Sequence, residues 1–144
     1  MKLIENKKLH LTYTIASTFE AGIELLGLEV KSLRKKLGNL DGAKIIVRGG
    51  EAFLIGAYIP PYQAGNTPAS YDPYRTRKLL LNKEEIEEIY GHEISKTLTL
   101  HPLSLYSKKN LIKCEVAVCK KKNTRDKRED IKKDIVRREL RSAQ

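Results

Sequence analysis

Residues 44–55 read KIIVRGGEAFLI, and this stretch decides which class of fold the sequence predicts. Two runs rich in β-branched and aromatic residues, 44–47 and 52–55, flank the tetrad Arg-Gly-Gly-Glu. A Gly-Gly pair supplies the positive φ angles that a tight hairpin turn requires. Pro60 and Pro61 then end the strand signal. We therefore expect an antiparallel hairpin near the middle of the chain.

Further short strands are predicted on both sides of this hairpin. Towards the N-terminus, apolar and polar residues alternate over 9–15, residues 18–22 break the alternation, and a second strand begins within 23–28. Towards the C-terminus, residues 97–101, 103–107 and 111–119 predict three strands, with a turn at 108–110. Many short strands at regular spacing favour a small β-barrel or a β-sandwich.

Short helices are expected beside the sheet, two or three in all. Val30, Leu33 and Leu37 recur at helical spacing, so a helix over 29–37 would bury this stripe and expose the basic residues between its members.

A second helix is predicted to begin after residue 82. Asn82 and Glu85 have the spacing of a capping box, and Gly91 is expected to end the helix. Residues 62–77, between the hairpin and this helix, form a long loop, and loops of this length in a compact domain tend to carry function.

Composition and charge point to a basic protein with one folded body. The chain has 144 residues, 40% of them apolar, and a formal net charge of +10, which favours nucleic acid or an anionic membrane surface as a partner. Residues 120–144 hold 11 of the 28 basic and 5 of the 18 acidic residues, so more than half of the excess charge lies there. We expect a folded body, 1–122, and a basic C-terminal tail, 123–144.

Several other classes of protein are not indicated. There is no apolar run of about 18 residues and no secretory leader, so a cytoplasmic protein without a membrane anchor is expected. Cys114 and Cys119 are predicted on opposite faces of a strand as free, buried side chains. His10, His92 and His101 are isolated in three elements, so neither a metal, another cofactor nor catalysis is expected, although a histidine-dependent RNA-processing enzyme stays open.

Basic residues gather in four separate elements of the predicted body, and the long loop alternates tyrosines with basic residues. Base stacking together with phosphate contact is the usual chemistry of such a surface, and OB-type barrels bind RNA in this way. An ordinary solvated surface is the alternative. The four basic groups are 7–8, 31–36, 75–78 and 108–109.

Several stretches, in order along the chain, resemble the SsrA-binding protein (SmpB) family, the protein partner of bacterial transfer-messenger RNA. The resemblance implies a mainly β, OB-like antiparallel β-barrel with short helices and a basic C-terminal tail, and no catalytic activity. The stretches are NKK (6–8), FEAGIELLGLEVKSLR (19–34), GNL (38–40), GEAFLIGAYIPPY (50–62), DPYRTRKLLL (72–81), PLSLY (102–106) and DKREDIK (126–132).

The resemblance also implies partners and contact residues. Members bind the tRNA-like domain of transfer-messenger RNA and enter stalled ribosomes with elongation factor Tu, so that the nascent peptide is tagged for degradation. Leu80 could instead belong to the core, and Glu20 could instead anchor a turn. A structural ribosomal protein is the competing function. The implied RNA contacts are Asn6, Glu20, Leu80 and Lys113, with Lys7, Lys8, Lys31, Arg34 and Lys78 as neighbours.

The tail has apolar residues at helical spacing but too few of them to dock it firmly. We expect a monomer whose tail is disordered alone and becomes helical when phosphates neutralise it. The resemblance places this tail at the decoding centre and in the vacant mRNA channel of the ribosome. The apolar residues are Ile131, Ile135, Val136 and Leu140; the expected ribosome contacts are Asp126, Lys127, Arg128, Lys132, Lys133, Arg137 and Arg138.

Overall fold

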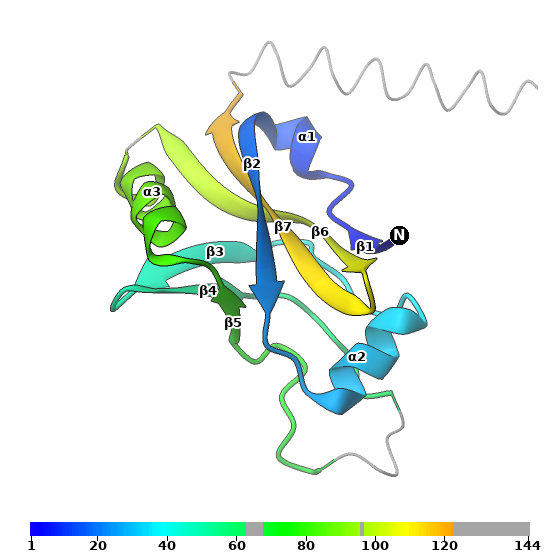
Figure 1. Ribbon diagram of the computed structural model, residues 1–144. Helices are drawn as coiled ribbons and strands as arrows, with labels where there is room; N and C mark the ends of the chain where they lie inside the picture. The colour runs from blue at the N-terminus through cyan, green and yellow to red at the C-terminus, as the bar shows by residue number, and fades with distance from the viewer. Residues whose placement is uncertain (63–67, 96, 123–144) are drawn as a thin grey trace, which may run out of the picture.

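An antiparallel sheet and three short helices make up the part of the chain that the computed structural model describes, residues 1–62, 68–95 and 97–122 (Figure 1). The strands are β1 (Lys2–Glu5), β2 (Tyr13–Ile23), β3 (Lys44–Arg48), β4 (Glu51–Ile55), β5 (Arg77–Leu80), β6 (Leu98–Lys108) and β7 (Leu111–Lys121). The helices are α1 (Leu9–Thr12), α2 (Gly27–Arg34) and α3 (Lys83–Ile94).

The seven strands pair in the order β1-β6-β7-β2-β5-β4-β3. Every pairing is antiparallel, which confirms the predicted mainly β, antiparallel architecture with short helices. Among the described residues no strand pairing joins β1 to β3, so backbone hydrogen bonds do not close the predicted OB-like barrel. A side-chain contact joins β6, the neighbour of edge strand β1, to the residue before edge strand β3, because His101 Nδ1 lies 3.4 Å from the carbonyl oxygen of Ala43.

Two hairpins with two-residue turns fix the register of the sheet. Gly49 and Gly50 both have positive φ (59° and 74°), which confirms the hairpin predicted from residues 44–55. Lys109 and Asn110 have φ of 50° and 64° and form the corresponding turn between β6 and β7. The long strands β6 and β7 therefore lie side by side over their whole length.

Parts of residues 9–28 were predicted incorrectly, although 13–15 of the predicted strand do lie in β2. Leu9–Thr12 is the short helix α1 and not a strand, because Leu9 packs on Ala117 and Cys119 of β7. Residues 18–22 do not break a strand; they lie within β2, paired with β7. Residues 23–28 do not form a second strand, because β2 ends at Ile23 and α2 begins at Gly27.

Three further boundaries differ from the predictions. Helix α2 begins and ends earlier than 29–37, so Leu37 is exposed. The capping box at Asn82 and Glu85 is present, with both hydrogen bonds formed, but α3 continues past Gly91 to Ile94. The expected strands 97–101 and 103–107 are one strand, β6, which absorbs the interruption as a register shift between Pro102 and Ser104.

The core lies on one face of the curved sheet, and a smaller cluster lies on the opposite face under α1. Cys114 belongs to the main core and Cys119 to the smaller cluster, and both thiols are free and buried. The predicted placement on opposite strand faces is therefore confirmed. No helix within the described residues is long and apolar enough to span a membrane.

Candidate nucleic-acid interface

The face of the sheet opposite the main core is covered by α1 at one end and exposed at the other. At the exposed end, Gly22 of β2 pairs with Lys113 of β7 on one side and with Leu80 of β5 on the other. Directly paired residues point to the same face of a sheet, as do residues two apart in a strand. Glu20, two residues before Gly22, therefore lies on this face too. Three of the predicted RNA contacts, Glu20, Leu80 and Lys113, are thus brought together.

By the same register, Lys78 of β5 and two side chains of β6 lie on this face. Tyr106 is paired with Lys113, and Lys108 follows Tyr106 by two residues. We call this surface the open face. It includes Glu20, Gly22, Lys78, Leu80, Tyr106, Lys108, Lys113 and Glu115.

Glu20 is a carboxylate of the open face and lies directly opposite a second one, Glu115 of β7. The hydrogen bond with Tyr106, followed by that from Lys108, holds the pKa of Glu20 below its ordinary value, while burial and the same carboxylate raise the pKa of Tyr106. The ammonium of Lys108 lies 3.1 Å from Glu20 Oε2. Glu20 lies within β2 and bonds side chains of β6, so it does not anchor a turn. It presents an ionised acceptor suited to a ribose hydroxyl or a base amino group.

Leu80 is not a core residue, although it lies within an apolar triplet. Its exposed fraction is 50%, whereas that of Leu79 is 1%, because successive residues of β5 point to opposite faces. A Cβ on Gly22 would lie 3.1 Å from Leu80 Cβ, so the glycine makes room for the leucine on the open face. The core alternative for Leu80 is therefore wrong. Leu80 offers an apolar contact between Lys78 and Lys113.

The cations of α2 lie near the same end of the sheet. Arg34 Nη2 donates to the carbonyl oxygen of Asn110, at 3.2 Å, in the turn between β6 and β7. Lys31 is exposed on the same helix, and Lys78 forms an exposed ion pair with Glu51 at 3.1 Å. Such surface pairs are weak and exchange readily for a phosphate.

The predicted basic group 75–78 is divided by the fold. Arg77 is fully buried, and its Nε and Nη2 donate to Glu29 Oε2 at 2.9 and 2.6 Å. Arg75 Nη2 donates to Glu29 Oε1 at 2.5 Å, with 29% of its side chain exposed. Glu29 therefore neutralises cations that the sequence suggested for RNA. Lys78 lies on the other face of β5, and its side chain remains exposed enough to bind a phosphate.

The contacts of Glu29 fix α2 against β5 and the preceding loop. Burial alone would raise the pKa of Glu29, but the hydrogen bonds from Arg75, the Leu26 amide and Arg77 outweigh it and leave this pKa below its ordinary value. Arg77 also donates to the carbonyl oxygens of Ala57 at 2.7 Å and Pro73 at 3.0 Å. Sequence reasoning missed this network, since nothing local distinguishes Glu29 from an exposed helical glutamate.

The tyrosines of the long loop have different roles. The hydroxyl of Tyr71 has two acceptors within hydrogen-bond distance, Glu29 Oε2 at 3.0 Å and the Ile59 carbonyl oxygen at 2.8 Å. Burial, and after it the Glu29 carboxylate, raises the pKa of Tyr71 to about 12. Tyr74 is 58% exposed and packs on Tyr58 with 5.1 Å between ring centroids. Tyr74 is therefore the described tyrosine of this loop best placed to stack on a base.

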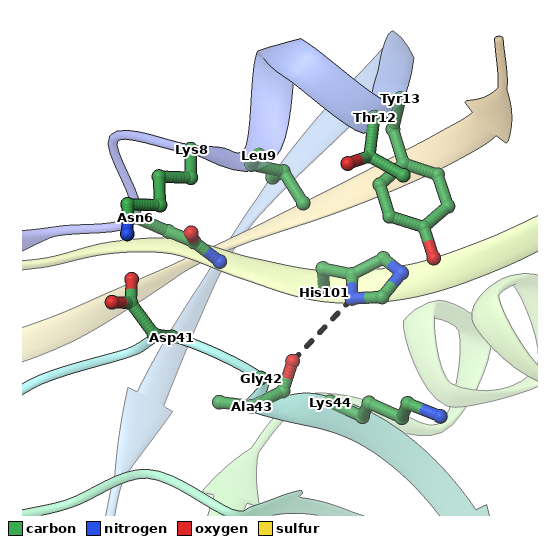
Figure 2. Close-up of a pocket in the computed structure, with 10 residues that line it drawn as sticks. All are labelled: Asn6, Lys8, Leu9, Thr12, Tyr13, Asp41, Gly42, Ala43, Lys44 and His101. Atoms are coloured by element: carbon green, nitrogen blue, oxygen red, sulfur yellow. Dashed lines mark hydrogen bonds between the residues drawn. The ribbon is translucent and has the colours of Figure 1, made fainter. Parts of the chain in front are cut away.

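Asn6, Lys7 and Lys8 lie apart from the open face, on the connection between β1 and α1. Asn6 is 8% exposed, and its Nδ2 donates to the carbonyl oxygen of Pro102 at 3.2 Å. Figure 2 shows Asn6 and Lys8 at the rim of a hollow that His101 also lines. Asn6 therefore has a structural hydrogen bond as well as access to this hollow.

Within residues 1–62, 68–95 and 97–122, no three or more His, Cys, Asp or Glu side chains gather as metal ligands would. The predicted tail contacts lie outside the described residues: Asp126, Lys127, Arg128, Lys132, Lys133, Arg137 and Arg138.

A protein-family model described as SmpB protein matches residues 3–144, nearly the whole sequence. The chain belongs to the SmpB family. Relatives named SsrA-binding protein include that of Mesoplasma florum, 48% identical over 94% of this chain and 92% of the relative, and that of Microcystis aeruginosa, 41% identical over 96% and 90%. A chain from a solved structure described as “tmRNA-SmpB: a journey to the center of the bacterial ribosome” is 36% identical, with a TM-score of 0.72 over 91% of this chain and 95% of that chain.

Proposed function

We propose that this chain binds the tRNA-like domain of transfer-messenger RNA and delivers it to stalled ribosomes in trans-translation. The observation that carries the proposal is the meeting of Glu20, Leu80 and Lys113 on the open face of an SmpB-family sheet. The SsrA-binding relatives and the tmRNA–SmpB structure support the choice of RNA and ribosome as partners.

The open face is suited to a folded RNA rather than to a small substrate. Lys113, Lys78 and the nearby Lys31 and Arg34 neutralise phosphates, which releases counterions and gives binding that weakens steeply with salt. Glu20 accepts a hydrogen bond from a base or ribose, and Leu80 packs against a sugar or base. In RNA recognition, contacts to phosphates typically position the RNA, whereas contacts to bases and riboses distinguish one RNA from another.

The finer parts of the function concern the tail and the ribosome. The basic tail, 123–144, enters the empty mRNA channel beyond the decoding centre and becomes helical as RNA phosphates neutralise it. The body, 1–122, holds the RNA, and elongation factor Tu joins through the RNA. The protein acts in the cytoplasm as a monomeric adaptor with no catalytic step of its own.

A gel-shift with the tRNA-like domain tests both halves of this assignment. The full chain is expected to bind tightly at low salt, and removal of residues 123–144 is expected to leave that affinity within about threefold while abolishing peptide tagging in a reconstituted translation assay. Failure of the full chain to bind the RNA refutes the RNA assignment. An equal loss of RNA affinity and tagging on deletion refutes the division between body and tail.

A further inference from the structure

A hollow of about 350 Å³ opens where the two ends of the sheet approach each other, and it is lined by residues outside the open face (Figure 2). Its walls come from the segment that joins β1 to β2, from the loop before β3 and from β6. We propose that this hollow binds one nucleotide, with the base on its aromatic floor and the phosphate at its lysine rim. The choice of RNA as the physiological source rests on the proposed function.

The floor of the hollow is apolar and aromatic. Leu9, Ala43 and His101 are nearly completely buried, and the ring of Tyr13 lies 4.4 Å from that of His101, measured between centroids. Flat aromatic side chains are the surfaces on which proteins stack unpaired bases. A volume of this size falls within the range of small-ligand sites, which begins at roughly 300 Å³.

His101 holds the walls of the hollow together. A carbonyl oxygen can only accept, so the contact of 3.4 Å between His101 Nδ1 and Ala43 places the ring proton on Nδ1. Nε2 lies 3.0 Å from the hydroxyl of Thr99, which can donate to it when the ring is neutral. Burial lowers the pKa of His101, which favours that neutral form, and the contact with Ala43 joins β6 to the residue before β3.

The rim carries cations that are free to bind a phosphate. Lys8 and Lys44 are exposed, and neither side chain has a hydrogen bond or ion pair among the residues described. By contrast, Lys2, Lys78 and Lys108 are each paired with a glutamate. Two unpaired ammonium groups around one cavity are an expected anion site.

Polar acceptors at the same rim are suited to the sugar or the base edge. Asn6 Nδ2 is occupied by the Pro102 carbonyl, which leaves the amide oxygen available to accept. The exposed carboxylate of Asp41 also lines the hollow. A ribose hydroxyl or an exocyclic amino group can donate to either. The two lysines outnumber this one carboxylate, so the rim stays positive, as a phosphodiester requires.

The chemistry fits a nucleotide within an RNA strand or a free mononucleotide, and titration of the ¹⁵N-labelled full chain distinguishes them. The probes are AMP, single-stranded tetra-adenylate, adenosine and inorganic phosphate. AMP and tetra-adenylate are expected to shift the resonances of Gly42, Lys44 and His101, and adenosine or phosphate alone to bind at least about tenfold more weakly. Tighter binding of tetra-adenylate than of AMP assigns the site to RNA; equal affinity assigns it to a free nucleotide.

A double variant with a matched control completes the test. Lys8→Ala with Lys44→Ala is expected to weaken AMP binding about tenfold, whereas Lys83→Ala with Lys120→Ala, which removes the same charge from exposed sites elsewhere, changes it less than about twofold. Shifts confined to the open face, or equal losses in the two double variants, overturn the nucleotide site. The affinity of the wild-type chain for the tRNA-like RNA is measured in parallel. A chain that binds this RNA but not AMP refutes the nucleotide site alone, whereas a chain that does not bind the RNA refutes the proposed function.

Discussion

Glu29 and Glu20 each bond basic side chains, but the surroundings of the two carboxylates differ. Glu29 is fully buried and receives hydrogen bonds from Arg75, Arg77 and the Leu26 amide. Glu20 is exposed on the open face beside Lys108, and the Lys108 ammonium can leave it for a phosphate. The comparison teaches that burial, and not the presence of a charged pair, separates a structural contact from a binding group.

Arg77→Met is expected to have the largest effect on this comparison. The substitution keeps most of the side-chain volume but leaves the Glu29 carboxylate buried without its fully buried partner, which costs about 3–5 kcal/mol. Urea denaturation measures this change in the free energy of unfolding. The control, Arg48→Met, breaks the more exposed pair with Glu93 and is expected to cost less than about 1 kcal/mol. Equal costs would contradict the structural role of Glu29.

A pair of leucine substitutions compares the two faces of β5. Leu79→Ala removes a buried side chain from the core and is expected to lower the free energy of unfolding by about 2–5 kcal/mol. Leu80→Ala removes a half-exposed one and is expected to cost less than about 1 kcal/mol while weakening RNA binding. The two free energies come from the same denaturation experiment. Similar values would refute the assignment of opposite faces.

Acid is expected to weaken the Glu29 network in particular. The folded pKa of Glu29 is below the ordinary value of 4.5, so its stabilising contribution is complete above that pH and is lost as the pH falls through the folded pKa. Glu29→Gln should therefore reduce the difference in unfolding free energy between pH 7 and pH 3. Glu93→Gln serves as the matched control. An unchanged pH dependence in Glu29→Gln would show that this carboxylate is not the acid-sensitive group.

The open face itself is expected to give the smallest effects on stability and clear effects on RNA. Lys113→Ala removes a phosphate contact and should weaken binding of the tRNA-like domain roughly five- to tenfold, with a shallower salt dependence. Glu20→Gln keeps the size of the side chain but removes the charged acceptor, and it should also weaken binding. Gel-shifts at several salt concentrations measure both. If either substitution unfolded the protein instead of lowering its affinity for RNA, that residue would have a structural role like that of Glu29.

Several elements were predictable because their signals are local. Gly49 and Gly50 fix a turn through positive φ, and Asn82 with Glu85 caps a helix through hydrogen bonds three residues apart. The alternation that suggested a strand over 9–15 failed over 9–12, because Leu9 gains more by packing on β7 as part of a helix. The residues 18–22 likewise continue β2 because β7 pairs with them along that length.

The sequence by itself determined the antiparallel hairpins, the capped helix, the excess of positive charge and, through its motifs, the family. The tertiary structure alone decided which basic and apolar residues face outwards. In the run Arg77-Lys78-Leu79-Leu80, two adjacent cations and two adjacent leucines leave the sequence without an alternating pattern. Pairing with β2 and β4, together with the buried Glu29, turns Arg77 and Leu79 inwards. Lys78 and Leu80 then point outwards, because neighbouring residues of a strand project to opposite faces.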